Sequence, residues 1–255
     1  MIKKYCVQKD AMGCSFYVYY KGEHNGGGPL MNKYLFDTDD FLEEHKDCKS
    51  VLEVCSGPGF VGWLLYKRLK MDSVHFLDIH KPVEEDLKLT AEANNEELNF
   101  YHSDGFKNYD GPKVDLIVMN PPFFYSEEQF EHHKKHMGYN RKNYGDRLEK
   151  KIKTSRRIIL DLDFKMHDNL IDNFEKYLTD NGRIVFLEDS NFVPPKLFLE
   201  KYGDKTNIKP KYKEYYIPPE YFNENGEMVR MKNSEGIPEN IINYYTLTYY
   251  KNENN

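Results

Sequence analysis

Several features that would identify common classes of protein are missing from this chain of 255 residues. No run reaches the ~18 apolar residues needed to cross a bilayer, and the opening stretch "MIKKYCVQKDAMG" has no apolar segment typical of a signal peptide. The four cysteines form no C-x-x-C pair, which argues against both a zinc site and a disulfide framework. We therefore expect no membrane partner and a reducing, cytoplasmic setting.

The chain also has no surplus of positive charge. Its net charge of −6 argues against a broad electrostatic surface for nucleic acid, although a local basic patch is compatible with it. Hydrophobic residues make up 39% of the chain and charged residues 31%, which is typical of globular proteins. This length is enough for one sizeable domain with a buried core, or for one domain with a small appendage.

Short apolar runs alternate with amphipathic segments from about residue 50 onward. The runs predict strands at 50–57, 73–80, 98–106, 114–120 and 183–189. Helical spacing of apolar residues predicts helices at 60–70, 82–95 and 166–182, the last ended by Asn181-Gly182. Strands that alternate with helices indicate an α/β protein with a parallel sheet and right-handed crossovers.

The last part of the chain has a different pattern. "KYKEYYI" (211–217) and "NYYTLTYY" (243–250) are typical of two strands joined by a long loop, and we expect them to pair antiparallel. The first 49 residues fit no clear part of this arrangement.

Polar residues and glycines follow the predicted strands at their carboxyl ends, where ligands bind in open α/β sheets. The first strand runs into Glu53-Val54-Cys55-Ser56-Gly57-Pro58-Gly59, whose glycines allow a sharp turn and a close approach of a ligand. No G-K-[ST] follows, so this is not a P-loop. Asp78 follows the second strand and suits a ribose diol, Asp104 follows the third and suits an adenine amine, and Asn120 ends the fourth.

Taken together, these segments resemble class I S-adenosylmethionine-dependent methyltransferases over roughly residues 50–190. "VLEVCSGPG" resembles their glycine-rich first motif, "LDIH" their ribose-binding acid, "HSDGF" their adenine-contacting acid and "NPPF" the catalytic motif of their amino-methylating branch, which includes the HemK-like enzymes. One departure is Cys55, which stands where the family most often has its first glycine and could narrow the loop.

The resemblance implies a Rossmann-like fold with a largely parallel seven-stranded sheet and an antiparallel C-terminal strand pair. It implies S-adenosyl-L-methionine as cofactor and no metal. The cofactor-binding residues that it implies are Glu53, Cys55, Ser56, Gly57, Gly59, Asp78, Ile79, Asp104, Gly105 and Asn120.

The resemblance also assigns the catalytic residues Asn120, Pro121, Pro122 and Phe123. The nitrogen lone pair of an exocyclic amine or a side-chain amide is delocalised, so the group is a poor nucleophile. Acceptors for both of its N–H groups, here the Asn120 side chain and the Pro121 carbonyl, would orient that lone pair toward the methyl group. Phe123 would pack against the flat acceptor.

A basic insertion follows this motif, at about 125–160. Within it, residues 132–157 contain ten Lys or Arg and two acidic residues, so they form either a solvated face or a substrate lid that meets phosphates or an acidic protein. His132 and His136 are four residues apart, but no third ligand suggests a metal site. Asp163 and His167 share that spacing, and we expect a helix cap and a surface pair.

Two units are expected from this organisation. Residues 1–49 would cover or flank the cofactor site, with the glycines of 24–36 as a loop or a hinge, and residues 50–255 would form the catalytic domain.

The sequence thus predicts an N-methyltransferase that modifies a planar nitrogen, with the side-chain amide of glutamine in a protein as the favoured acceptor. An adenine amino group in RNA or DNA is the alternative acceptor, and the basic segment 132–157 would favour it. A non-catalytic scaffold that binds the cofactor and a partner, and a dehydrogenase, are alternatives from other classes. The sequence does not set the oligomeric state.

Overall fold

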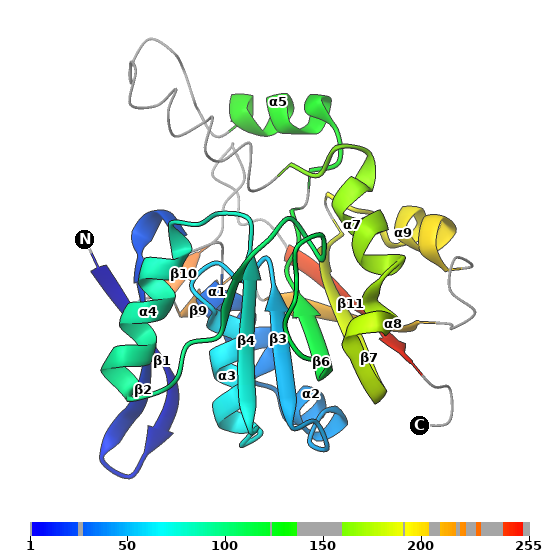
Figure 1. The fold of residues 1–255 in the computed structure, drawn as a ribbon. Helices are drawn as coiled ribbons and strands as arrows, with labels where there is room; N and C mark the ends of the chain where they lie inside the picture. The colour runs from blue at the N-terminus through cyan, green and yellow to red at the C-terminus, as the bar shows by residue number, and fades with distance from the viewer. Residues whose placement is uncertain are drawn as a thin grey trace.

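The structure is a computed structural model that describes residues 2–24, 28–122, 124–136, 160–190, 192–203, 210–217, 220–222, 228–230 and 242–251. Its centre is a seven-stranded sheet with the strand order β5-β4-β3-β6-β7-β11-β8 (Figure 1). The strands are β3 (Ser50–Val54), β4 (Ser73–Asp78), β5 (Phe100–His102), β6 (Val114–Met119), β7 (Leu178–Asp189), β8 (Lys211–Ile217) and β11 (Ile242–Tyr250).

The direction of the strands confirms the predicted fold class. β3 pairs in parallel with β4 and β6, β4 pairs in parallel with β5, and β6 in parallel with β7. β11 is antiparallel to both β7 and β8, as the last two apolar runs predicted. The carboxyl ends of the parallel strands therefore meet at one edge of the sheet, where the predicted site residues follow them.

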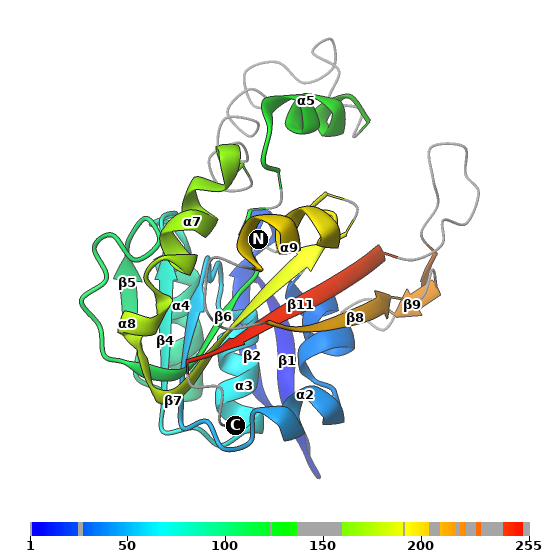
Figure 2. The same ribbon diagram turned by 90° about the vertical axis from the view of Figure 1, so that its right-hand side faces the viewer.

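Helices cover both faces of the sheet, which is why its central strands are almost continuously apolar. Helices α3 (Phe60–Arg68) and α4 (Val83–Asn94) pack on one face, in a core that contains Trp63, Phe76 and Leu87. Helices α7 (Lys165–Ile171), α8 (Phe174–Tyr177) and α9 (Pro195–Tyr202) pack on the other face, against Phe186 among others (Figure 2).

The remaining elements are short or lie outside the central sheet. An antiparallel hairpin precedes it, and a second pair of strands follows β8. The bounds are β1 (Ile2–Asp10), β2 (Gly13–Lys21), η1 (Gly22–His24), α1 (Gly28–Met31), η2 (Asn32–Phe36), α2 (Asp39–Glu44), α5 (Glu127–His136), η3 (Leu162–Phe164), β9 (Glu220–Phe222) and β10 (Met228–Arg230).

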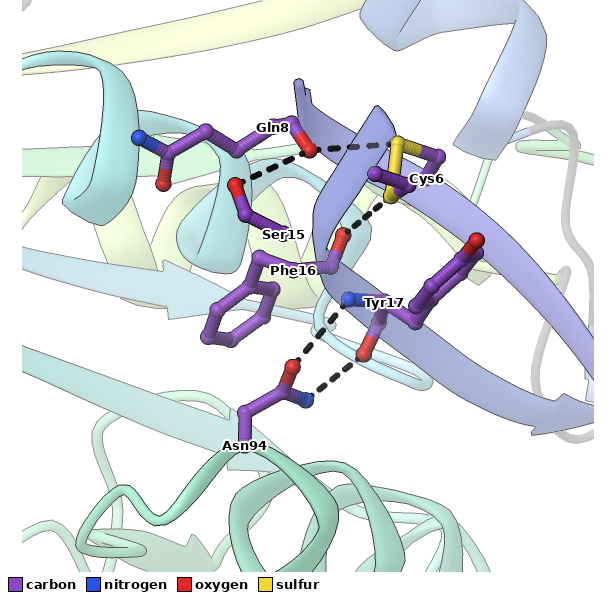
Figure 3. Close-up of a disulfide and its surroundings, with 7 residues drawn as sticks. Cys6, Gln8, Ser15, Phe16, Tyr17 and Asn94 are labelled. Carbon is purple, nitrogen blue, oxygen red and sulfur yellow. Dashed lines mark hydrogen bonds between the residues drawn. A yellow bond between two sulfur atoms is a disulfide. The ribbon is translucent and has the colours of Figure 1, made fainter. Parts of the chain in front are cut away.

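The hairpin β1–β2 is attached to α4 through its edge strand. Asp86, Thr90 and Asn94 are four residues apart on α4, and they hydrogen-bond to the backbone of every second residue of β2 from Tyr17 to Lys21. Asn94 both accepts from the Tyr17 amide at 3.1 Å and donates to its carbonyl at 2.8 Å (Figure 3). These side chains satisfy the polar groups of a strand edge that would otherwise be unpaired.

A disulfide joins Cys6 on β1 to Cys14 on β2, with their Cα atoms 5.9 Å apart (Figure 3). The prediction that the cysteines form no disulfide is therefore wrong for this pair. The seven residues between them hold a hairpin turn, which brings the two strands together. No strand is predicted for this segment, so the sequence pattern does not indicate that the two cysteines meet. Cys48 and Cys55 have free thiols.

The predicted helix 166–182 is interrupted. It consists of α7 and α8, separated at Asp172 and Asn173, and β7 begins directly afterwards at Leu178. Asn181-Gly182 lies inside β7 rather than at a helix end, because Val114 of β6 pairs with Leu178 and Leu116 with Arg183, which leaves extra residues on the β7 side.

Among the helices in the part of the chain that the structure describes, none is both long and apolar enough to cross a membrane.

Candidate active site

The carboxyl ends of β3, β4 and β6 form one row of residues. Val54 pairs with both Leu77 and Met119, so Cys55, Asp78 and Asn120 follow at the same level on three neighbouring strands. The structure therefore brings together the segments after β3, β4 and β6 that the sequence predicted to form a site.

Glu53 holds the turn between β3 and α3. Its carboxylate accepts from the backbone N–H of Gly62 at 2.7 Å and of Val61 at 3.3 Å, in the first turn of α3. The side chain is buried, and burial raises the pKa of its carboxyl to about 8, although the two backbone donors lower it. Glu53 thus fixes the turn from β3 into α3, which contains the glycine loop Cys55–Gly59.

Glycines in this loop meet two different requirements. Gly59 has φ +81°, and a Cβ there would lie 2.6 Å from Phe76 and 2.7 Å from Leu87. Gly57 has φ +49°, but among the described residues a Cβ there would meet only the His24 carbonyl, at 3.8 Å. Gly59 is therefore required for packing, while Gly57 borders open space that a ligand can occupy.

The loop spacing alone does not identify the ligand. Gly57, Gly59 and Gly62 stand in the order G-x-G-x-x-G, which dinucleotide-binding proteins also use. The choice between a dehydrogenase and a methyltransferase therefore depends on the residues after the other strands and on the comparisons below.

Cys55 occupies a left-handed backbone conformation, with φ +57°. This conformation explains why glycine is common at this position in the proteins that the sequence resembles, because a Cβ costs energy there. The thiol is partly buried, and burial, with nearby acidic groups such as Asp78, raises its pKa. Its sulfur lies 3.4 Å from the Met166 sulfur, so it faces the start of α7.

Asp78 lies at the end of β4 with its carboxylate turned toward the glycine loop. Its two oxygens accept from the Gly57 N–H at 2.8 Å and from the His80 N–H at 2.7 Å. Burial raises its pKa, against the lowering effect of these two donors. Each carboxylate oxygen can accept a further hydrogen bond, which is what recognition of a ribose diol requires.

Two residues beside Asp78 form the rim of the site. Ile79 is one of the few large apolar side chains that are exposed, at 42%. His24, from the end of the hairpin segment, is bound to Asp86 of α4 at 2.7 Å, and its ring lies 5.4 Å from that of His80. The sequence did not indicate His24, because its connection to the site depends on the docking of the hairpin on α4.

Asp104 and Gly105 follow β5, and only Gly105 of the two is buried. Asp104 is exposed, as expected for a residue that would contact the outer edge of a ligand. Gly105 has φ +53°, and a Cβ there would lie 2.7 Å from the Asn169 side chain, whose oxygen accepts from the Phe106 N–H. The turn after β5 is thereby held against α7.

Asn120 follows β6 and is partly exposed. Within the described ranges, no hydrogen bond engages its side chain, whereas Pro121 after it is buried and Pro122 is partly buried. Phe123 lies outside the described residues. The side-chain amide of Asn120 therefore makes no hydrogen bond to the described residues. Asn120 lies at the same level of the sheet as the start of the glycine loop.

The chain after this motif contacts the start of α7. The Phe124 carbonyl accepts from the Asp161 N–H at 2.8 Å, and the Tyr125 carbonyl accepts from the Asp163 N–H at 3.1 Å. The expected surface pair of Asp163 and His167 is wrong. His167 is fully buried and pairs with Asp161 and with Glu188 of β7, because Asp163 takes a left-handed conformation that turns the chain before α7.

Comparison with known proteins shows similarity to methyltransferases over part of the chain. Residues 38–138 match the model of the methyltransferase small domain family. Ribosomal RNA small subunit methyltransferase C of Hahella chejuensis is 40% identical over 81 residues, 32% of this chain and 23% of that protein. Ribosomal RNA large subunit methyltransferase G of Pseudoalteromonas translucida is 27% identical over 97 residues, 36% of this chain and 25% of that protein. The chain thus spans no more than 25% of the length of these two relatives.

A solved structure shows the same fold over nearly the whole chain. The 16S rRNA N2 G1207 methyltransferase of T. thermophilus, in complex with AdoMet and guanosine, aligns with a TM-score of 0.53 at 13% identity, covering 99% of this chain and 51% of that chain. These findings confirm the predicted methyltransferase fold. Residues 38–138 thus resemble the methyltransferase small domain family, and the chain as a whole has the fold of that solved methyltransferase.

Proposed function

We propose that this chain is an S-adenosylmethionine-dependent methyltransferase that modifies an exocyclic amino group of a nucleobase in RNA. The observation that carries the proposal is the position of Asn120, whose amide is free of the described neighbours and lies level with the glycine loop of a methyltransferase domain. The names of the relatives, which are ribosomal RNA methyltransferases, support RNA as the acceptor.

The residues at the end of β4 fit the cofactor. Asp78 would accept from the ribose hydroxyls with the lone pairs that its backbone donors leave free. The exposed Ile79 would pack against the adenine ring, and Asp104 would accept from the adenine amine. Gly57, Ser56 and Cys55 would line the methionine end, where Gly57 borders open space. When bound, S-adenosylmethionine supplies a methyl group that its sulfonium already activates.

Asn120 and the prolines after it would orient the acceptor. The Asn120 oxygen and the Pro121 carbonyl would accept from the two N–H groups of the amine, so that its lone pair points toward the methyl group. Pro121 is buried and Pro122 restricts the residue before it, which fixes the direction of that carbonyl. Phe123 would cover the base, as expected from the sequence.

These two hydrogen-bond acceptors suit any planar nitrogen. The proposed substrates, a nucleobase amine and a glutamine amide, therefore differ only in the molecule that carries the nitrogen. The comparisons give more support to RNA than to the side-chain amide of glutamine, which the sequence favoured. The scaffold alternative would leave the free amide of Asn120 without a role. Of the basic segment 132–157, only α5 up to His136 lies within the described residues, and a phosphate-binding role for the rest stays a prediction.

Residues 1–49 would serve as a flank of the cofactor site, and 50–255 as the catalytic domain. The support for this division is the position of His24, whose carbonyl is the nearest neighbour of a Cβ built on Gly57. The proposed hinge at 24–36 includes residues 25–27, which lie outside the described residues.

Methyl transfer from labelled S-adenosylmethionine tests the proposal. The acceptors would be an unmodified ribosomal RNA transcript, the same RNA as a duplex with its complement, and a glutamine-containing peptide. We expect label in the RNA, and digestion to nucleosides would then distinguish a guanine N2 from an adenine N6 product. Label in the peptide alone would favour the glutamine alternative. Tight cofactor binding with no transfer to any acceptor would favour the scaffold.

A further inference from the structure

The chain just before α7 is held in a conformation that side chains disfavour. Asp163 and Phe164 are consecutive and both have left-handed backbones, with φ of 57° and 61°. Neither is a glycine, so each conformation is strained and persists only where the surroundings impose it.

A buried group of three charged side chains imposes it. The Asp161 carboxylate accepts from the backbone N–H of Met166 at 2.8 Å and of His167 at 3.2 Å, and it bonds to His167 Nδ1 at 2.6 Å. The other ring nitrogen, Nε2, lies 2.8 Å from Glu188 Oε1. Both partners are carboxylates, so both ring nitrogens donate only if the imidazole carries a positive charge.

His167 is charged at neutral pH. Burial alone would lower its pKa, but Glu188 and Asp161 outweigh that effect and raise the pKa of His167 to about 9. The second oxygen of Glu188 is buried and has no hydrogen-bond partner in the described part of the chain. His167 is thus the contact through which the Glu188 carboxylate is neutralised.

Other titratable or charged groups stand around this trio. β7 contributes Asp189, which is next to Glu188 in the chain. Burial raises the pKa of Glu188. α9 contributes Tyr202, whose ring stacks 6.4 Å from that of His167, and Lys201, which pairs with Asp168 of α7 at 3.3 Å. Lys201 bonds to Asp168 and, at 3.2 Å, to the Asp163 carbonyl of the segment itself, rather than to Asp161 or Glu188, so none of these groups replaces His167 as the counter-ion.

The strained segment links the two halves of the candidate site. Its backbone donates to the carbonyls of Phe124 and Tyr125, and the Phe164 ring stacks on that of Tyr125 at 4.8 Å and 14°. At its other end, Met166 touches Cys55 of the glycine loop. The segment therefore holds the chain directly after Asn120-Pro121-Pro122-Phe123 in place relative to the cofactor loop.

We infer that His167, held between Asp161 and Glu188, is a positioning residue. Through the segment 161–166 it fixes Phe124 and Tyr125, which directly follow Asn120-Pro121-Pro122-Phe123 and are called the catalytic loop together with that motif. This inference rests on the proposed function, because the loop matters for turnover only if the site transfers methyl groups. Of the described residues, His167 bonds to Asp161 and Glu188 and to none assigned to the ligand site, so it acts through the backbone bonds of Asp161 and Asp163.

The test compares wild type with His167→Gln/Glu188→Gln, which removes one positive and one negative charge of the three and leaves Asp161 in place. We expect turnover at saturating cofactor to fall about 10-fold, which is a modest misplacement effect, while the Kd for S-adenosylmethionine changes less than about threefold. The ratio of wild-type to variant turnover should also shrink as the pH rises from 7 to about 9.5, because wild-type His167 then loses its charge. Titration of the acceptor affects wild type and variant equally, so it cancels in the ratio of the two turnover rates.

Glu200→Gln is the matched control, since Glu200 lies on the exposed side of α9, where it pairs with Lys196. It should leave all three measurements unchanged. If the double variant does not fold, Glu188→Gln alone takes its place. Wild-type turnover should fall at alkaline pH as His167 loses its charge. In Glu188→Gln this fall should move to lower pH by about one unit, because the carboxylate that raises the pKa of His167 is gone. Turnover within twofold of wild type in the folded double variant, a ratio that does not change with pH, or an unshifted fall in Glu188→Gln would overturn the inference.

Hydrogen exchange separates this outcome from failure of the proposed function. The Asp161 and Asp163 amides donate to the catalytic loop, and their protection should decrease in the variant and not in the control. That loss of protection would support the positioning role even if wild type methylates nothing, in which case only the proposed function fails. Unchanged protection of both amides would overturn the inference without reference to activity.

Discussion

The two halves of the candidate site are built in different ways. On the cofactor side, Glu53 binds backbone N–H groups in the first turn of α3, and Asp78 binds those of Gly57 and His80, all within a few tens of residues in sequence. On the catalytic side, the chain after Asn120 is bonded to residues 161–163, beyond the basic insertion, and the Asn120 side chain meets no described partner. The cofactor side is thus complete without a ligand, whereas the acceptor side depends on a distant support and leaves its key amide open.

This difference predicts that binding and turnover can be separated by substitution. Asn120→Ala should reduce turnover by about 100-fold or more, as removal of a preorganised hydrogen-bonding group does in other enzymes, while S-adenosylmethionine binds nearly as in wild type. Steady-state methyl transfer and calorimetry on the same sample would measure both. Asn108→Ala, at an exposed position after β5, is the control. Unchanged turnover in Asn120→Ala would remove Asn120 from the catalytic role.

The pH dependence of stability should show the cost of burying Glu53. Its carboxyl has a pKa of about 8 in the folded chain, above its ordinary value of 4.5, so between these values the folded state holds a proton that the unfolded state has lost. The free energy of unfolding should therefore fall as the pH rises from about 5 to 8.

Glu53→Gln should flatten this slope, since the amide does not titrate. Urea unfolding at several pH values would measure it, with Glu43→Gln as the control, because Glu43 is exposed and pairs with Lys46 at the surface. An equal slope in wild type and Glu53→Gln would contradict the assignment of this titration to Glu53.

The smallest expected effect concerns the loop backbone. Cys55→Gly should raise the free energy of unfolding by up to about 1 kcal/mol, because glycine adopts the left-handed conformation without the cost of a Cβ. Cys48→Gly is the contrasting variant, since Cys48 is buried and has no positive φ, and it should lower stability. Thermal unfolding of both would test this. Destabilisation by Cys55→Gly would mean that contacts of the thiol, such as that with Met166, outweigh the backbone strain.

The sequence predicted the parts of the molecule that depend on local pattern. The parallel strands, the closing antiparallel pair and the position of Asn120 follow from apolar runs and from the rule that ligands bind at carboxyl ends of strands. The same rule placed Asp78 and the glycine loop at one edge.

The remaining features depend on contacts between distant segments. Cys6 and Cys14 meet through a hairpin whose edge is held by α4, and His24 reaches the site only because of that docking. His167 looked like a surface residue because a helical spacing from Asp163 was assumed, and the left-handed turn before α7 instead directs it into the core. No local pattern could indicate that turn.

Calorimetric titration of S-adenosylmethionine into wild type and Asp78→Asn tests the central claim, that the carboxyl edge of β3 and β4 is a cofactor site already formed in the free protein. Asp110→Asn, an exposed acid after β5, serves as the control. We expect wild type and the control to bind one equivalent per chain, and Asp78→Asn to bind about 10- to 100-fold more weakly, the loss expected for charge-assisted hydrogen bonds. Equal affinity in all three proteins, or no binding by folded wild type, would contradict the account.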